Sequence, residues 1–434
     1  MVGRNFLWMS WSGFISIANS LLIWIFMARL RDVDEVGRFT IVMGLYSLFY
    51  TIVSLGLMPY LVNEISRRSV ARVESESSVA QFVSSSFVFL TFSGVLSTIL
   101  MSSGGFLVSN SWQVRISTIV LSLAMIPSGI GAVFEANAVA HGRVRLVAIV
   151  STVENLIRTI VPLGLIWFGY DIFSICVAFA SVRFIAILVY FVAGQFRVSE
   201  IDFSYKDFRE IARVCPTFAG TVTASSINWQ APLFMLGYLS SEAASAEFGA
   251  ASRFLIPVTI LMSSYGNVLQ PSLAKYKNES AEKYGRYLGK MAVYPVIAAA
   301  AIALGSVLFS RQALTILFGE TYQTAAPVLN LLALSVIPYC LVIVAARGLV
   351  AINSARVDLA GNILGVVICI SAGAILIPRY GAVGAAASHL ISFLSIAALS
   401  VGYLARRTGG AAGWKTTSWS SAALILMSAF LWKM

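Results

Sequence analysis

Three charged side chains interrupt two of the most apolar stretches of this sequence. Glu154 and Arg158 lie in "ENLIRTIVP", inside an apolar run from Leu146 to Phe168, and Arg183 lies in the next run, from Ile172 to Gly194. A guanidinium group is a rigid, planar fork of N–H donors that binds a phosphate or a carboxylate through two hydrogen bonds at once. The chemistry open to these residues is therefore anion binding or ion pairing.

Two interpretations of these charges stay open from the sequence. Glu154 and Arg158 are four residues apart, so in a helix they share one face and can neutralise each other as a structural pair. Arg183 has no acidic residue within helical reach in its own run. It must either pair with Glu154 across the two helices or face a water-filled cavity that receives an anionic headgroup, since a charge within a span costs about 2.5–3.5 kcal/mol.

Further polar residues could line such a cavity. The run from Val214 to Leu239 is unusually polar. Single Ser and Thr residues in spans act by default as packing contacts between helices, whereas the bulkier amide side chains are better cavity candidates. Arg253 lies toward the end of its run and could instead extend to the membrane interface. The candidate substrate-contacting residues are Arg158, Arg183, Arg253, Asn228, Gln230, Asn19 and Glu154.

The composition of the chain indicates which class of structure positions these residues. Of the 434 residues, 58% are hydrophobic and only 11% are charged, whereas an ordinary soluble domain carries about 25% charged residues. Apolar runs long enough to cross a bilayer, about 20 residues each, follow one another almost end to end. We therefore predict an all-α polytopic membrane protein with about twelve transmembrane helices.

The expected spans follow from these runs. A further apolar stretch, Thr416 to Trp432, is shorter and is either an interfacial helix or a thirteenth span. The twelve expected spans are Phe6–Leu30, Phe39–Asn63, Val79–Met101, Arg115–Asn137, Leu146–Phe168, Ile172–Gly194, Val214–Leu239, Phe248–Pro271, Tyr287–Phe309, Thr324–Arg347, Val357–Ile377 and Val383–Ala405.

Several classes of function are disfavoured. The four cysteines lie in or beside apolar runs without short spacings, and only two histidines are present, so neither a disulfide framework nor a metal site is expected. The sequence contains no phosphate-binding G-x-x-x-x-G-K-[ST] motif, and its loops are too short for a catalytic domain. We expect no enzyme activity and no cofactor. Coupling to H⁺ or Na⁺ stays open.

The net charge of +11 has a simpler explanation than nucleic-acid binding. Most Lys and Arg residues fall on the side of the membrane that holds the N-terminus, which predicts a cytoplasmic N-terminus. The longest hydrophilic stretch contains "SYKDFREIAR", whose apolar residues recur at helical spacing and predict a cytoplasmic amphipathic helix. The expected domains are an N-lobe (1–195), this linker (196–213), a C-lobe (214–405) and a C-terminal tail (406–434).

The two halves of the chain share a pattern. One interval separates Glu35 from Glu247 and Gly37 from Gly249, and it recurs between Pro59 and Pro271 and between Leu61 and Leu273. A shared interval across these elements favours duplication of a six-span unit. Two such copies would enter the membrane in the same orientation, and a binding cleft between them is expected.

Three stretches carry a resemblance to a known family. They are "DEVGRFTIVMGLYS" (34–47), "GLMPYLVNEISRR" (56–68) and "LIPRYGAVGAAASHLIS" (376–392). Over essentially all twelve spans the chain resembles the polysaccharide-transporter branch of the MOP flippase superfamily, which includes the Wzx-type O-antigen flippases. The resemblance implies two six-helix lobes in a V shape, as in the MATE transporters, and a bacterial inner-membrane location.

The resemblance also implies a function. Such proteins move undecaprenyl-diphosphate-linked oligosaccharide, an O-antigen or exopolysaccharide repeat unit, from the inner to the outer leaflet by alternating access. The implied partners are this lipid-linked oligosaccharide, membrane lipids, and a polysaccharide polymerase with other glycan-assembly proteins. The alternative is a MATE-like exporter of drugs coupled to Na⁺ or H⁺, which would call for acidic residues in the first span, and that span has none.

Overall fold

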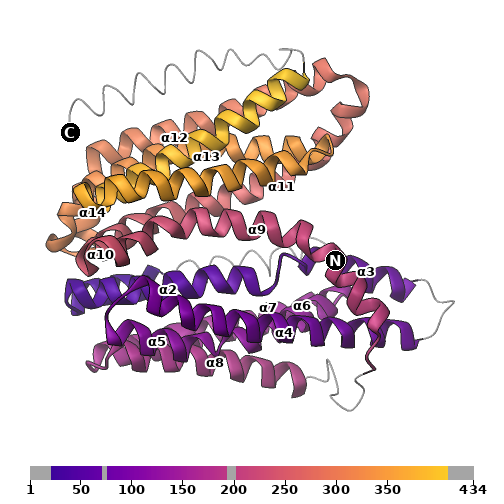
Figure 1. Cartoon of the computed structure of the whole chain (residues 1–434), viewed down its shortest axis with the longest axis horizontal. Coiled ribbons are helices and arrows are strands. Elements are labelled where there is room, and N and C mark those ends of the chain that lie inside the picture. The colour runs from indigo at the N-terminus through magenta and orange to yellow at the C-terminus, as the bar shows by residue number, and fades with distance from the viewer. Residues whose placement is uncertain (1–20, 71–75, 193–201, 409–434) are drawn as a thin grey trace. The chain divides into compact units, whose positions relative to one another are not determined.

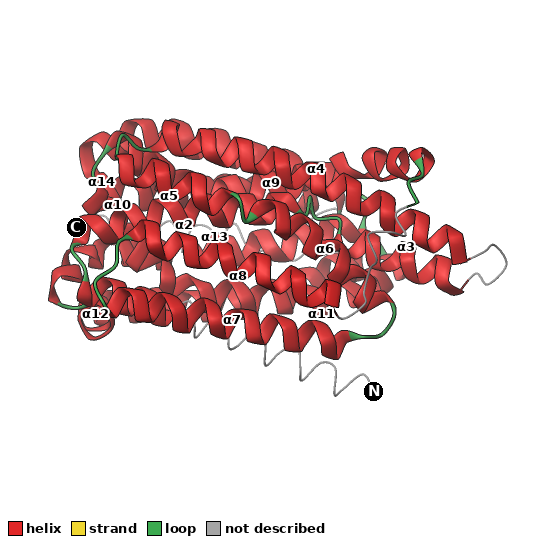
Figure 2. Ribbon diagram, turned by 90° about the horizontal axis from the view of Figure 1, so that it is seen from below, coloured by secondary structure: helices red, strands yellow, loops and turns green. Residues whose placement is uncertain are grey.

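The computed structural model describes residues 21–70, 76–192 and 202–408, and within them every regular element is a helix (Figures 1 and 2). The prediction of an all-α protein is confirmed. Asn19, the start of the first expected span and the stretch from Thr416 to Trp432 lie outside the described residues.

The helices follow one another with short connections. A first apolar helix covers Leu21–Leu30. The elements after it are α2 (Val33–Val53), α3 (Met58–Val70), α4 (Glu76–Val108), α5 (Trp112–Ser122), α6 (Met125–Ala140), α7 (Val144–Trp167), α8 (Ile172–Val192), α9 (Tyr205–Leu239), α10 (Glu242–Ser252), η2 (Arg253–Leu255), α11 (Ile256–Glu279), α12 (Ala281–Phe318), η3 (Glu320–Ala325), α13 (Ala326–Ala351) and α14 (Ala355–Arg407).

The expected number of spans agrees with this arrangement. Among the described residues, 8 helical segments are long and apolar enough to cross a membrane. The last of them, α14, contains two expected spans, because the chain reverses at Gly381 (φ 52°, ψ −127°), a conformation that glycine adopts at little cost. Its two arms pack together, and the Ser392 hydroxyl donates to the carbonyl of Gly365 at 2.8 Å. The three remaining expected spans correspond to the helix over Leu21–Leu30, to α9 and to α11.

The chain divides into two compact units, Met1–Ala246 and Glu247–Met434. Helix α9 falls in the first unit because it packs against α2 and α4. Glycines allow this close approach: a Cβ added at Gly237 would lie 3.0 Å from the carbonyl oxygen of Val108. The expected linker and the seventh span form the one continuous helix α9, and the lobe boundary at 196–213 stays a prediction.

The two halves repeat one turn in detail. The turn between α6 and α7 and the turn between α13 and α14 each place one residue in the left-handed region, Gly142 (φ 73°) and Asn353 (φ 57°). Both turns close with a bond from an N–H to the carbonyl five residues earlier. These bonds join Arg143 to Ala138 and Ser354 to Leu349, each at 2.8 Å. The turn after α7 closes in the same way, with Gly169 at φ 85° and a bond from Tyr170 to Leu165 at 3.0 Å. The geometry of this turn therefore agrees with the duplication but is not particular to it.

The contact between α2 and α10 generates a prediction. A Cβ added at Gly37 would overlap the carbonyl oxygen of Glu242, the first residue of α10, so Gly37→Ala must push the backbones apart. Overpacking of this kind costs about 1–3 kcal/mol, and we expect a lower unfolding temperature of the purified protein.

Gly164→Ala in α7 is the matched control, because a Cβ there would meet no atom within 4 Å. Replacing a helical glycine by alanine at an open position stabilises by roughly 0.5–1 kcal/mol. Equal unfolding temperatures for the two variants would contradict the close contact at Gly37.

Candidate functional site

The charged residues of α7 and α8 meet inside the first unit. The two helices are consecutive and pack against each other, which brings Glu154 of α7 opposite Arg183 of α8. The Nη1 atom of Arg183 donates to both carboxylate oxygens of Glu154, at 2.9 and 2.8 Å. Both side chains are 7% exposed. Arg183 thus has a partner across the helix pair, one of the two interpretations that the sequence left open.

Glu154 is shared with a second cation. The Nη1 atom of Arg158 lies 3.4 Å from one oxygen of Glu154, and its Nη2 atom donates to the hydroxyl of Tyr46 on α2 at 2.7 Å. The contact to Glu154 is longer than that of Arg183, and the Arg158 side chain is more exposed, at 15%. Glu154 therefore binds Arg183 firmly and Arg158 loosely.

Neighbouring helices hold the Arg183 guanidinium from its other sides. Its Nε atom donates to the hydroxyl of Ser128 at 3.1 Å, and its Nη2 atom donates to the hydroxyl of Tyr50 at 3.3 Å. Gly131 on α6 leaves room for the group, since a Cβ there would lie 3.5 Å from Nη2. All three donor nitrogens of Arg183 are thus used.

Aromatic rings line the cluster of Glu154, Arg158 and Arg183. Tyr46 and Tyr50 stack with ring centroids 5.7 Å apart. The guanidinium carbon of Arg158 lies 5.4 Å from the Tyr46 ring and 5.2 Å from that of Phe179. Faces of aromatic rings attract cations. These rings therefore stabilise the charge of Arg158, which has to share the Glu154 carboxylate with Arg183.

Two acidic and two basic side chains meet in this part of the unit. Glu154 serves the guanidinium groups of both Arg158 and Arg183, and Glu135 on α6 also interacts electrostatically with Arg183. Arg158 is the less compensated of the two cations, because its contact to Glu154 is long and its second contact is a neutral hydroxyl. An anion that reaches this part of the unit would find a partly paired guanidinium.

The other candidates lie elsewhere. Asn228 and Gln230 are on α9, and Asn228 is buried. Gln230 faces α2: a Cβ added at Gly44 of α2 would lie 3.4 Å from the Oε1 atom of Gln230. Arg253 lies in η2, in the second unit. Substrate contact by these residues, and by Arg158, Arg183 and Glu154, stays a prediction.

Sequence reasoning missed the residues that complete the cluster, namely Tyr46, Tyr50, Ser128 and Phe179. The two tyrosines did carry a signal, because they lie four residues apart in an apolar run and so share a helix face. A tyrosine in an apolar segment usually finds a partner for its hydroxyl. Ser128 and Phe179 have no such signal.

The second half differs at the position that matches Glu154. At the interval set by the repeated turn, the counterpart of Glu154 is Gly365. A Cβ at Gly365 would lie 2.5 Å from the side chain of Ile396, so the two arms of α14 touch where α7 and α8 enclose an ion pair. In the part of the chain that the structure describes, no group of three or more His, Cys, Asp or Glu side chains could hold a metal ion.

Comparison with known proteins places these features in a family. A family model described as "Polysaccharide biosynthesis protein" matches residues 2–277. A curated relative from Shigella flexneri, described as "Putative O-antigen transporter", is 22% identical over 218 residues, which cover 49% of this chain and 51% of the relative. The chain thus matches about half the length of that relative.

Solved structures show the same fold. Lipid II flippase MurJ, in an inward closed conformation, has a TM-score of 0.74 at 14% identity, covering 94% of this chain and 90% of MurJ. An inward-facing multidrug resistance MATE family transporter of the MOP superfamily has a TM-score of 0.76 at 14% identity, covering 91% of this chain and 95% of the transporter. At these identities the likeness establishes the fold.

The shared carboxylate leads to a prediction about stability. Glu154→Gln leaves the buried Arg183 without its counter-charge, and breaking a buried pair on one side costs about 3–5 kcal/mol. We expect a markedly lower unfolding temperature. The double variant Glu154→Gln/Arg183→Met should recover most of the loss, because it removes both charges.

Glu279→Gln is the control, because it breaks the exposed pair of Glu279 with Lys283 at 3.0 Å, and exposed pairs contribute only about 0–1 kcal/mol. If Glu154→Gln unfolded at the temperature of this control, the ion pair with Arg183 would not support the fold.

Proposed function

The chain belongs to the polysaccharide biosynthesis protein family, and from that membership we propose that it flips a lipid-linked oligosaccharide across the membrane. It is a multi-pass membrane protein with the fold shared by MurJ and the MATE transporters, and it is not an enzyme. The proposed cargo is an undecaprenyl-diphosphate-linked repeat unit of an O-antigen or exopolysaccharide, moved from the inner to the outer leaflet by alternating access.

One observation supports this proposal above the others: the Arg158 guanidinium is only partly paired, by a 3.4 Å contact to Glu154 and by the hydroxyl of Tyr46. The polyprenyl tail of such a carrier can stay in lipid and its sugars can cross in water, but its diphosphate must meet positive charge within the membrane. A guanidinium group binds phosphate through two hydrogen bonds. Arg158 is held loosely by Glu154 and by one hydroxyl, so it can exchange these partners for phosphate oxygens.

The neighbouring residues take different roles in this proposal. When a phosphate binds Arg158, Glu154 must give up only its weaker contact, because both of its oxygens accept from Arg183. Arg183 is therefore a positioning residue that keeps the carboxylate away from the incoming anion. This differs from the expectation that Arg183 itself contacts the headgroup, since its nitrogens already have partners.

The rival function is a MATE-like exporter of drugs coupled to Na⁺ or H⁺. The fold does not separate the two, because the TM-scores to MurJ and to the MATE transporter are nearly equal. The pairing of the charges favours the flippase: the acids Glu154 and Glu135 both interact with Arg183, and the side chain left partly paired is a guanidinium group, which suits an anionic cargo better than a cationic drug.

The membrane in which the protein lies, its orientation and its partners are also proposed. The relative described as an O-antigen transporter supports the inner membrane of a bacterium as its location, and the distribution of Lys and Arg supports a cytoplasmic N-terminus. A polysaccharide polymerase and other glycan-assembly proteins would then act on the translocated product.

The test compares variants of the full chain in a strain that lacks the gene. Arg158→Ala should abolish surface polysaccharide at normal protein levels, with lipid-linked precursor accumulating on the inner leaflet. Arg158→Lys should retain part of the activity, because it keeps the charge but loses the two-pronged geometry. The readouts are surface polysaccharide and precursor in extracted lipids.

Arg286→Ala is the control, because Arg286 pairs with Glu282 on an exposed face of α12. It should complement fully. Normal surface polysaccharide with Arg158→Ala would remove Arg158 from the site, and a gene deletion that leaves polysaccharide unchanged but sensitises cells to cationic drugs would favour the exporter.

A further inference from the structure

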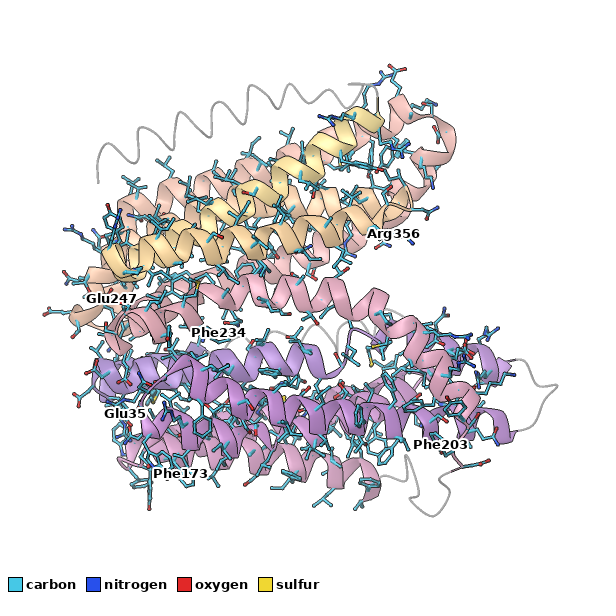
Figure 3. All side chains as sticks on the ribbon, in the orientation of Figure 1. Glu35, Phe173, Phe203, Phe234, Glu247 and Arg356 are labelled. Atoms are coloured by element: carbon cyan, nitrogen blue, oxygen red, sulfur yellow. The ribbon has the colours of Figure 1, made fainter. Side chains whose placement is uncertain are left out.

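The first turns of α9 present two different faces. The helix starts after Ser204, whose hydroxyl accepts from the N–H of Asp207 at 3.3 Å. Phe203 lies just before it, at the end of the first unit where α3 also ends (Figure 3). This region is the amphipathic segment expected from sequence, and the structure shows what each of its faces contacts.

One face is anchored by a buried network of charges. Arg68 at the end of α3 donates to Glu64 at 2.7 Å and to Asp207 at 3.0 Å, and Asp207 and Glu64 are buried. Ile211, one turn after Asp207, is fully buried against the same helices. These contacts fix the rotation of α9 about its axis, so the opposite face must point away from the unit.

The opposite face carries three cations. Lys206, Arg209 and Arg213 recur at helical spacing and are all exposed. No described carboxylate forms an ion pair with any of them. Exposed aromatic rings accompany them: Tyr205 is 70% exposed and Phe203 is 48% exposed.

Two basic residues at the start of α12 are arranged differently. On α12, Lys283 pairs with Glu279 at 3.0 Å and Arg286 pairs with Glu282 at 2.8 Å. Lys283 is thus compensated by the last residue of α11, and Arg286 is compensated by a residue of its own helix. At the start of α9, by contrast, Asp207 turns inward to Arg68, whereas Lys206, Arg209 and Arg213 turn outward.

We propose that Lys206, Arg209 and Arg213 form a docking strip for the headgroups of anionic phospholipids, in the leaflet at that end of α9. The strip lies where the helices of a membrane-spanning unit end, which is the depth of the headgroups. Aromatic rings beside basic residues are typical of that depth. Each Lys or Arg near an anionic bilayer surface contributes about fivefold in affinity. The proposal does not depend on what the protein transports.

The experiment titrates the purified full chain with phosphatidylglycerol or phosphatidylcholine and counts bound lipids by native mass spectrometry. The variant Lys206→Gln/Arg209→Gln/Arg213→Gln should lose about tenfold or more in affinity for phosphatidylglycerol and keep its affinity for phosphatidylcholine. The charge-conserving variant Lys206→Arg/Arg209→Lys/Arg213→Lys should bind like the unsubstituted chain, which shows that the fold is intact.

The matched control removes the same charge from α12, as Lys283→Gln/Arg286→Gln/Lys290→Gln, and should change the affinity by less than about threefold. The proposal is overturned if both triple variants lose affinity equally, which would indicate a response to net charge alone, or if neither does. Tighter binding of soluble poly-glutamate than of phosphatidylglycerol would also overturn it, in favour of an acidic protein partner.

Discussion

A guanidinium group enclosed by apolar helices must have a partner, and the pairing of Arg183 with Glu154 meets that requirement in the first unit. The cost of burying an uncompensated charge is several kcal/mol, so this pair constrains how α7 and α8 can rotate and slide. Ser128 and Tyr50 occupy the remaining donors of Arg183. Because Glu154 then serves Arg158 only weakly, the constraint that stabilises the fold also leaves one cation with capacity for an external anion.

The duplication shows how one backbone can carry two kinds of packing. The turn has the same hydrogen bond in both halves. The helices that follow it, α7 and α14, nevertheless carry different residues at the position of Glu154. Glu154 in the first half requires polar partners and space, whereas Gly365 in the second allows the arms of α14 to touch. Polar chemistry is thereby placed in one copy, while close packing of small residues supports the other.

Helix α9 is held to the first unit near both of its ends. At its start, Asp207 pairs with Arg68 of α3; just beyond its end, Glu242 pairs with Arg38 of α2. The sequence predicts that α9 opens the second copy, whereas in the structure these contacts place it in the first unit. The connection between the copies is thus a helix with specific contacts.

Local patterns in the sequence were enough to predict the helical class, about twelve spans, the amphipathic start of α9 and the duplication, because hydrophobicity, helical spacing and charge are properties of neighbouring residues. They also singled out Glu154, Arg158 and Arg183 as unusual. Which of the two arginines Glu154 binds more firmly was decided by the tertiary structure, since this depends on how α7 and α8 face each other.

The tyrosines at 46 and 50 entered the cluster for the same reason: α2 lies beside helices that are distant in sequence. The assignment of α9 to the first unit likewise followed from close backbone approach at Gly237. Contacts between helices depend on how each helix is rotated about its axis and on how deep it lies in the unit. The sequence of one helix alone does not specify either. The sequence by itself therefore determined the elements and the charges, and only their packing decided which charge is paired and which is left able to bind.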